Sequence, residues 1–301
     1  MTGDLIPGLP PVSELAVIIN VQTKYISSLA LLSAIRHIHI PVLVMDCESQ
    51  DGSFDWFSGL QRDHSFNLIR APRRPHGTAL DWLFQNAQAD SILLIDSDIE
   101  VLNKEMFEFM RARLQDDRPY GAGYLQPGEW FKTHYGTDQH AESGIGFYMT
   151  RPWIPFALLR VEPVREALVA GASFMHRLVL NDLPQVPAIG RLLWHRFRFP
   201  GLRQMRLGSL DYFRHEYEGR KPSYVFFDTG AQIHEVLTQR GFSFGDVGAA
   251  IPYWSIRHLQ GVTRDVLCGP THDACSAAAV EPIVLEKLKE YGIQEIKEEN
   301  I

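Results

Sequence analysis

Four short apolar runs recur about every 25 residues through the first third of the chain, which is the length of a strand-plus-helix unit. These runs are LAVIIN (15–20), PVLVMD (41–46), FNLIR (66–70) and SILLID (91–96). Between them, SSLALLSAIRHI (27–38) and TALDWLFQNAQ (78–88) carry apolar residues at helical spacing. Continuous apolar strands that alternate with helices predict an α/β fold with an open, mostly parallel sheet flanked by helices.

Each of the four runs ends in a polar residue, namely Asn20, Asp46, Arg70 or Asp96. Ligands of such sheets bind beyond the carboxyl ends of the strands. The sequence therefore predicts a polar ligand-binding edge.

The regular alternation stops at about residue 120. GAGYLQP (121–127) and GIGFYMT (144–150) predict short glycine-rich strands. The stretch from about 152 to 225 is aromatic and contains prolines, and we expect it to be irregular. The chain ends on VLEKLKEYGIQEIKEEN (284–300), which predicts an amphipathic helix for packing or for homo-oligomer formation.

Composition narrows the class of protein. A length of 301 residues allows one large α/β domain or two smaller ones. The net charge of -7 argues against nucleic-acid binding. We see no secretory signal and no membrane-spanning run, and three cysteines form no disulfide framework, so a cytoplasmic setting is expected. Cys268, His272 and Cys275 suggest zinc by their spacing, but coincidence is the preferred interpretation because a structural zinc site needs four ligands.

One segment departs from the acidic balance. Residues 183–210 contain five arginines and no acid. Two interpretations stay open, a solvated helix face paired with acids elsewhere and a surface for an anionic acceptor or anionic lipids at the membrane periphery.

Asp96-Ser97-Asp98 follows the fourth strand directly. One interpretation is a strand-to-helix turn that caps the next helix. The other is that the two carboxylates hold Mn²⁺ or Mg²⁺, and through it a diphosphate. The first strand runs into NVQTKY (20–25), without the glycines of a dinucleotide-binding loop, and no P-loop is present. A diphosphate would therefore need another source of positive charge, such as a metal ion.

Several motifs together resemble the GT-A nucleotide-sugar glycosyltransferases, most closely the family 2 group. LAVIINVQTKYISSLALLSAI is similar to the opening strand, polar loop and helix of that family. VLVMDCESQDGSFDWF carries its D-x-x-S-x-D-G-S/T pattern, and HGTALDWLFQNAQADSILLIDSDIEV leads into its D-x-D motif. FFDTGAQIHEVLTQRGF and SIRHLQG stand where the family has its base motif and a late His-containing strand.

The resemblance implies a role for each matching position. Asn20, Val21 and Gln22 would contact the edge of the nucleobase, and Asp46 would accept a hydrogen bond from it. The remaining donor contacts would come from Asp81, Asp96 and Ser97. The metal ligands would be Asp96, Asp98 and His258. For several of these positions, ordinary structural roles stay open: Asp46 and Asp51 as turn residues, Asp81 as a solvated helix position, and His258 as a structural histidine.

The base motif departs from the family pattern, because Asp228-Thr229-Gly230 replaces the usual paired acids. Asp228 would act as the base alone or with help from Glu235. The alternative is that Asp228 is the N-cap of the helix that follows.

From this resemblance we expect a metal-dependent transfer of a sugar from a nucleoside-diphosphate sugar to an acceptor hydroxyl, with inversion. A retaining transferase, a nucleotidyltransferase and a non-catalytic nucleotide-sugar-binding protein are the alternatives. Three parts are expected: residues 1–120 as the nucleotide-sugar-binding half, 121–265 as the acceptor-side and catalytic half of the same domain, and 266–301 as a helical extension.

Overall fold

The computed structural model describes residues 11–126, 145–148, 150–181, 212–213, 224–248, 250–259 and 277–293, together with Ile6. The arginine-rich segment 183–210 and the Cys268, His272 and Cys275 group lie outside the described residues.

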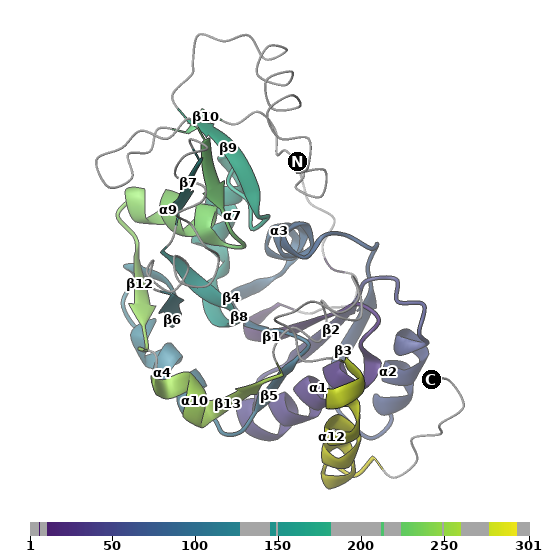
Figure 1. Ribbon diagram of the computed structural model, residues 1–301. Helices are drawn as coiled ribbons and strands as arrows, with labels where there is room; N and C mark the ends of the chain where they lie inside the picture. Colours follow the sequence, from purple (N-terminus) through teal and green to yellow (C-terminus); the bar gives the residue numbers. More distant parts are fainter. Residues whose placement is uncertain are drawn as a thin grey trace.

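A seven-stranded sheet forms the centre of the molecule, with the strand order β12-β6-β8-β4-β1-β2-β3 (Figure 1). Its strands are β1 (Val12–Asn20), β2 (Val42–Asp46), β3 (Asn67–Arg70), β4 (Ala89–Ile95), β6 (Pro119–Gln126), β8 (Arg151–Arg160) and β12 (Ser243–Asp246). Strands β4, β1, β2 and β3 are parallel to one another, and β8 runs antiparallel to both β4 and β6. The predicted fold class, an open and mostly parallel sheet flanked by helices, is confirmed.

Helices cover both faces of this sheet (Figure 1). One face packs against α3 (His76–Asn86), α7 (Val161–Val169) and α9 (Ala231–Gln239). The other packs against α1 (Lys24–Ile38), α2 (Ser53–Leu60) and α4 (Glu105–Arg113), with α10 (Ala250–Ser255) beside α4. The central strands are therefore buried on both sides, which explains why their sequences are continuously apolar.

Two smaller sheets complete the described structure. A four-stranded sheet has the order β10-β9-β11-β7. Its strands are β7 (Ile145–Tyr148), β9 (Arg177–Asn181), β10 (Tyr212–Phe213) and β11 (Tyr224–Phe227). An antiparallel pair joins β5 (Ile99–Val101) to β13 (Ile256–His258). This pair lies directly beyond the Asp96-Ser97-Asp98 segment.

The expectation of irregular structure from residue 152 onward is wrong for residues 152–169. Strand β8 lies between β4 and β6, and α7 follows it directly. Pro152 and Pro155 suggested an irregular segment because proline cannot donate a ladder hydrogen bond. At Pro155 the strand uses only its carbonyl, which accepts a hydrogen bond from the Asp96 amide at 2.9 Å. Pro152 lies beyond the residues that pair with β4 and faces Leu125, after a register shift in β6.

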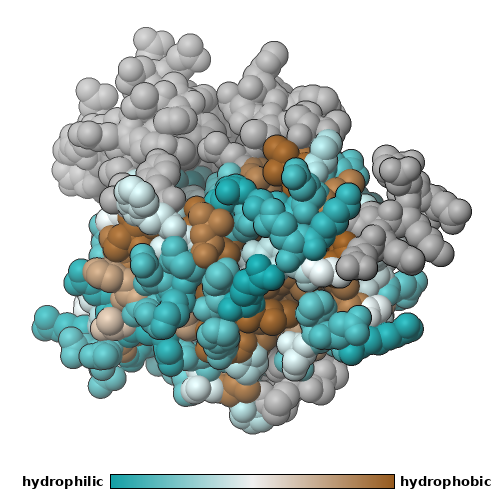
Figure 2. All heavy atoms as spheres, turned by 90° about the horizontal axis from the view of Figure 1, so that it is seen from below, coloured by the Kyte–Doolittle hydropathy of each residue, from teal (hydrophilic) through white to brown (hydrophobic). Residues whose placement is uncertain are grey.

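The C-terminal helix α12 (Ala277–Glu290) packs against α1. Val280, Val284 and Leu288 form an apolar cluster with three residues of α1, namely Ile26, Leu29 and Leu32. The packing role expected of the C-terminal helix is therefore present, and homo-oligomer formation stays a prediction. Among the helices in the described part of the chain, none is both long and apolar enough to span a bilayer. Seen from below, the surface shows hydrophilic residues interspersed with separate apolar patches (Figure 2).

Candidate functional site at the carboxyl edge of the sheet

Asp96 and Asp98 lie where β4 ends, at the carboxyl edge of the parallel strands and at the border with antiparallel β8. The segment does not lead into a helix, since β5 begins at Ile99 and α4 begins only at Glu105. The strand-to-helix cap that the sequence allowed is therefore wrong. Asp98 is buried, while Asp96 keeps 29% of its side-chain surface exposed.

The β5–β13 pair brings His258 to Asp98. His258 pairs with Ile99 in the ladder, and the Leu259 amide donates to the Asp98 carbonyl at 2.8 Å. This register places His258 Nε2 3.4 Å from Asp98 Oδ1. A second ion pair, between Arg257 Nη1 and Glu100 Oε2 at 3.0 Å, joins the same two strands. The structure thus brings together two residues that the sequence predicted as metal ligands from positions 160 apart.

A second histidine, His76, begins α3 and lies 3.7 Å (Nε2) from Asp96 Oδ1. Sequence reasoning did not select it. One signal was present, because His76 follows the third apolar run of the parallel series and so had to lie near the same edge as Asp96.

The electrostatics of the group reflect two carboxylates at close quarters. Burial raises the pKa of Asp96, and the charge of Asp98 raises it further, whereas His76 and His258 act in the opposite direction. Burial alone would lower the pKa of His258. The hydrogen bond to Asp98 and the charges of Asp98 and Asp96 outweigh it, so the pKa of His258 lies above its usual value.

The chemistry of these side chains fits a divalent cation. Carboxylate oxygens suit Mg²⁺ and Mn²⁺, and imidazole is a common ligand of transition metals. Two acids held together in a partly buried place also gain from a cation that offsets their repulsion. As the described side chains stand, no three of these residue types converge closely enough to form a complete metal centre. Asp96 and Asp98 each face a histidine instead.

Beside this group, Asn20 and Asp46 end β1 and β2 and are completely buried. Asn20 Nδ2 donates to Asp46 Oδ1 at 2.7 Å and to Ser49 Oγ at 3.0 Å. The side-chain oxygen of Asn20, Oδ1, accepts hydrogen bonds from Thr23 Oγ1 at 3.0 Å and from Ser27 Oγ at 2.8 Å. These two predicted donor-binding residues therefore hold the loops after β1 and β2 together. The surface that a ligand could reach at these loops is formed by the residues next to them.

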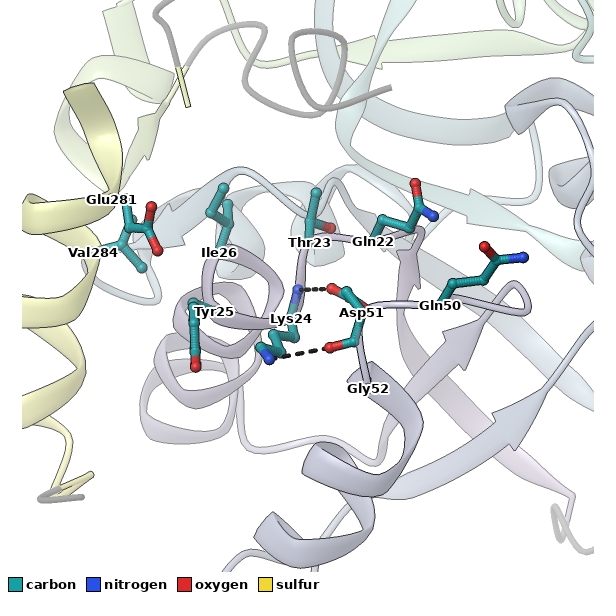
Figure 3. A pocket seen from close by; sticks show the side chains of 10 residues that line it. All are labelled: Gln22, Thr23, Lys24, Tyr25, Ile26, Gln50, Asp51, Gly52, Glu281 and Val284. Atoms are coloured by element: carbon teal, nitrogen blue, oxygen red, sulfur yellow. Dashed lines mark hydrogen bonds between the residues drawn. The ribbon is translucent and has the colours of Figure 1, made fainter. Parts of the chain in front are cut away.

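Those neighbours line a pocket of about 410 Å³ (Figure 3). Gln22 and Thr23 contribute from the first loop and Gln50 and Asp51 from the second, while α12 closes one side. Gln22 has a positive φ of 55°, and its backbone amide donates a hydrogen bond to Ser49 Oγ at 2.9 Å. Val21, the remaining predicted base contact, is partly buried.

Asp81 is engaged with the protein rather than solvated. Its carboxylate accepts from Ser173 Oγ at 2.5 Å and from the Phe174 amide at 2.7 Å. Ser173 also links to α9, because its amide donates to Gln232 Oε1 at 3.1 Å. Asp81 thus fastens α3 to the loop that supports the start of α9.

Asp228 lies between β11 and α9. Its Oδ2 is 2.9 Å from Arg151 Nη2, and its Oδ1 accepts from the Thr229 amide at 2.7 Å. The N-cap of α9 is Gly230, with a φ of 79° and no side-chain cap, so the helix-cap alternative for Asp228 is wrong. Arg151 is a buried residue that sequence reasoning missed, because β8 and β11 lie in different sheets and their approach has no local signature.

Two further residues of α9 face the interior. Glu235, considered as a helper for the base, is buried and accepts from Gln239 Nε2 at 2.5 Å. His234 is buried too, and its Nδ1 lies 2.7 Å from the Tyr120 hydroxyl. Burial lowers the pKa of His234 to about 4. The Glu235 side chain therefore belongs to the core packing of α9.

The sequence matches no protein-family model and no curated protein. Solved structures do show similarity. One is the mannosyltransferase PcManGT from Pyrobaculum calidifontis in complex with GDP-Man and Mn²⁺, at 13% identity and a TM-score of 0.41, over 96% of this chain and 73% of that one. Another is glucosyl-3-phosphoglycerate synthase from Mycobacterium tuberculosis with Mn²⁺, UDP and glucosyl-3-phosphoglycerate, at 12% identity and a TM-score of 0.42, over 94% and 81%.

The match to S. aureus TarS in complex with UDP, at 15% identity and a TM-score of 0.32, covers 38% of this chain and 36% of that chain. At TM-scores of this size, none of these likenesses assigns an activity to this chain.

Proposed function

We propose that this protein is a glycosyltransferase that moves a sugar from a nucleoside-diphosphate sugar to an acceptor hydroxyl, with Mn²⁺ or Mg²⁺ bound by Asp96, Asp98 and His258. The observation that carries the proposal is the group of two carboxylates and two imidazoles at the carboxyl edge of a parallel sheet. Without a glycine-rich loop, this edge needs a cation to receive a diphosphate, and the acids supply its ligands.

The metal would stabilise the charge that develops on the departing nucleoside diphosphate. In the donor site, Asn20 and Asp46 would act by fixing the two loops, and Val21 and Gln22 would reach the base. Asp81 and Ser97 would act by holding α3 and the β4–β5 turn in place. The acceptor, whether anionic or lipid-linked, would enter from the side of residues 121–265, and a peripheral membrane contact would involve residues 183–210.

For transfer with inversion, Asp228 would take the proton of the acceptor hydroxyl as its oxygen attacks the anomeric carbon. The contact with Arg151 does not prevent this, because a carboxylate has about four lone-pair sites and two of them are engaged here. The arginine and the Thr229 amide would hold the base in one orientation. Retention of configuration, which needs no such base, is the competing outcome, and the configuration of the product distinguishes the two.

The test compares Asp98→Asn with Asp90→Asn. Asp90 lies near the other end of the same strand and is exposed. Calorimetry with UDP-, GDP- and dTDP-sugars in Mn²⁺ should show that Asp98→Asn weakens the bound donor at least about 10- to 100-fold, since a ligand should cost no less than its supporting residues. Asp90→Asn should bind like the wild type. Unchanged donor affinity in Asp98→Asn would remove the metal assignment.

A further inference from the structure

The pocket beside α12 combines one apolar wall with hydrogen-bonding groups that have no partner within the described structure. Ile26 and Val284 form the wall. The side-chain amides of Gln22 and Gln50 and the carboxylate of Glu281 line the rest (Figure 3). A volume of about 410 Å³ is in the range of small-molecule sites.

The charges of this pocket do not suit a phosphate group. The ammonium group of its lysine already has a partner, because Lys24 Nζ donates to the Asp51 carbonyl at 3.1 Å. The backbone amide of Lys24 donates to Asp51 Oδ2 at 3.3 Å (Figure 3). The pocket therefore contains two carboxylates, those of Asp51 and Glu281, and only this one ammonium group. A flat, uncharged ligand that donates hydrogen bonds is the better match, since a carboxylate only accepts them.

The position of the pocket relative to Asp96 and Asp98, the acids at the end of β4, fits a nucleotide. The pocket begins at the loop after β1, the strand next to β4, and continues to the loop after β2. Strands β4 and β2 are two spacings apart, about 10 Å. On the other side, Leu259 packs into the same α1–α12 cluster as Ile26 and Val284, and it directly follows His258. A diphosphate at Asp98 would therefore leave its base within reach of this pocket.

We propose that this pocket holds the base of a guanine nucleotide and that Glu281 is the residue that selects guanine, an inference that rests on the proposed function. Guanine offers two adjacent donors, N1–H and the 2-amino group, which match the two oxygens of a carboxylate. Uracil offers one N–H between two carbonyl oxygens, and those oxygens face repulsion from Glu281. Charge-assisted pairs of this kind are among the strong hydrogen bonds of proteins.

The test measures the affinities of GDP, IDP and UDP by calorimetry in Mn²⁺ for the full chain and two variants. Glu281→Gln changes the pocket, and Glu286→Gln is the matched control, because Glu286 is an exposed residue of the same helix outside the pocket. The wild type should bind GDP about 10- to 100-fold more tightly than UDP. IDP, which lacks the 2-amino group, should fall between them. Glu281→Gln should lose the preference for GDP and should bind UDP at least as tightly as the wild type does, because the repulsion between Glu281 and the uracil oxygens is removed. Glu286→Gln should match the wild type.

The outcomes separate this inference from the proposed function. Binding of UDP as tight as that of GDP, or an equal loss of all three nucleotides in Glu281→Gln, overturns the guanine assignment while the transferase proposal stands. Failure of every nucleotide to bind the wild type overturns both. Should Glu281→Gln fold poorly in a thermal melt, the comparison of GDP with IDP on the wild type still decides, and equal affinities would contradict the assignment.

Discussion

At the scale of single residues, the acids at the carboxyl edge are held in pairs with cationic or titratable side chains. Asp96 faces His76, Asp98 faces His258, and Asp228 faces Arg151. Pairing lets carboxylates remain in partly buried places where an isolated charge would be costly. It also fixes their direction, which a metal ligand or a base requires.

Replacing Asp228 with Asn tests its role as base. The amide keeps the shape of the side chain and a contact with Arg151 but cannot take a proton, so sugar transfer should fall about 10²- to 10⁴-fold. Nucleotide affinity should be unchanged. Asp117→Asn is a suitable control, because Asp117 pairs with Arg160 in an exposed position away from the site, at 3.4 Å. A turnover number of Asp228→Asn close to that of the wild type would remove Asp228 from this role.

The sequence was informative about side chains that directly follow strands and uninformative about their partners. Asp96, Asp98 and Asp46 could be placed at one edge because parallel strands end there. The contacts of Asp228 with Arg151 and of Asp81 with Ser173 depend on how β8, α7 and α9 pack, and no local pattern encodes that packing. The packing of the two loops is likewise not encoded locally. Asn20 and Asp46 were therefore expected to touch a ligand, whereas the structure buries them between these loops.

At the scale of elements, a close approach fixes α3 beside the loop at residues 173–175. A Cβ atom at Gly77 would lie 2.5 Å from both the Cα and the amide nitrogen of Met175. Gly77→Ala should therefore destabilise the protein by about 1–3 kcal/mol in urea unfolding, since the backbone has to move. Gly59→Ala is the control, because nothing lies within 4 Å of that position in α2. This variant should be neutral or stabilised by roughly 0.5–1 kcal/mol. Equal effects of the two substitutions would contradict the contact.

The buried His234 of α9 predicts a pH dependence of stability. Its pKa falls from 6.5 to about 4 on burial, so the unfolded chain takes up a proton first as the pH drops. The stabilising contribution is complete above pH 6.5 and is lost progressively toward pH 4, by about 3 kcal/mol in total.

His234→Gln keeps a hydrogen-bonding group for Tyr120 but does not titrate in this range. The difference in unfolding free energy between the wild type and this variant should change across that pH range in favour of the variant. Parallel pH profiles of the two proteins would show that His234 is not buried in its neutral form.

Elements with uniform patterns were predictable and β8 was not. The four parallel strands and α1 and α3 appear where apolar spacing placed them, with shifts of a few residues at their ends. Strand β8 contains two prolines whose missing amides are tolerated only because of how β4 and β6 end beside them. That tolerance is a property of the assembled sheet.

At the scale of the whole molecule, the first helix and the last helix of the described chain meet at one place. Helix α12 packs on α1, and Arg36 Nη2 lies 3.4 Å from the Glu290 carbonyl, 254 residues away in sequence. The C-terminal helix thereby becomes one side of the pocket at the loops that follow β1 and β2. Sequence patterns predicted that this helix would pack, but not that it would line a site.

The most direct measurement is a crystal of the full chain soaked with Mn²⁺ and a nucleoside diphosphate, with the metal located by its anomalous scattering. We expect a manganese ion coordinated by Asp98 and by oxygens of the diphosphate. A diphosphate bound elsewhere, or a crystal in which Asp98 still faces only His258 at saturating metal and nucleotide, would contradict it.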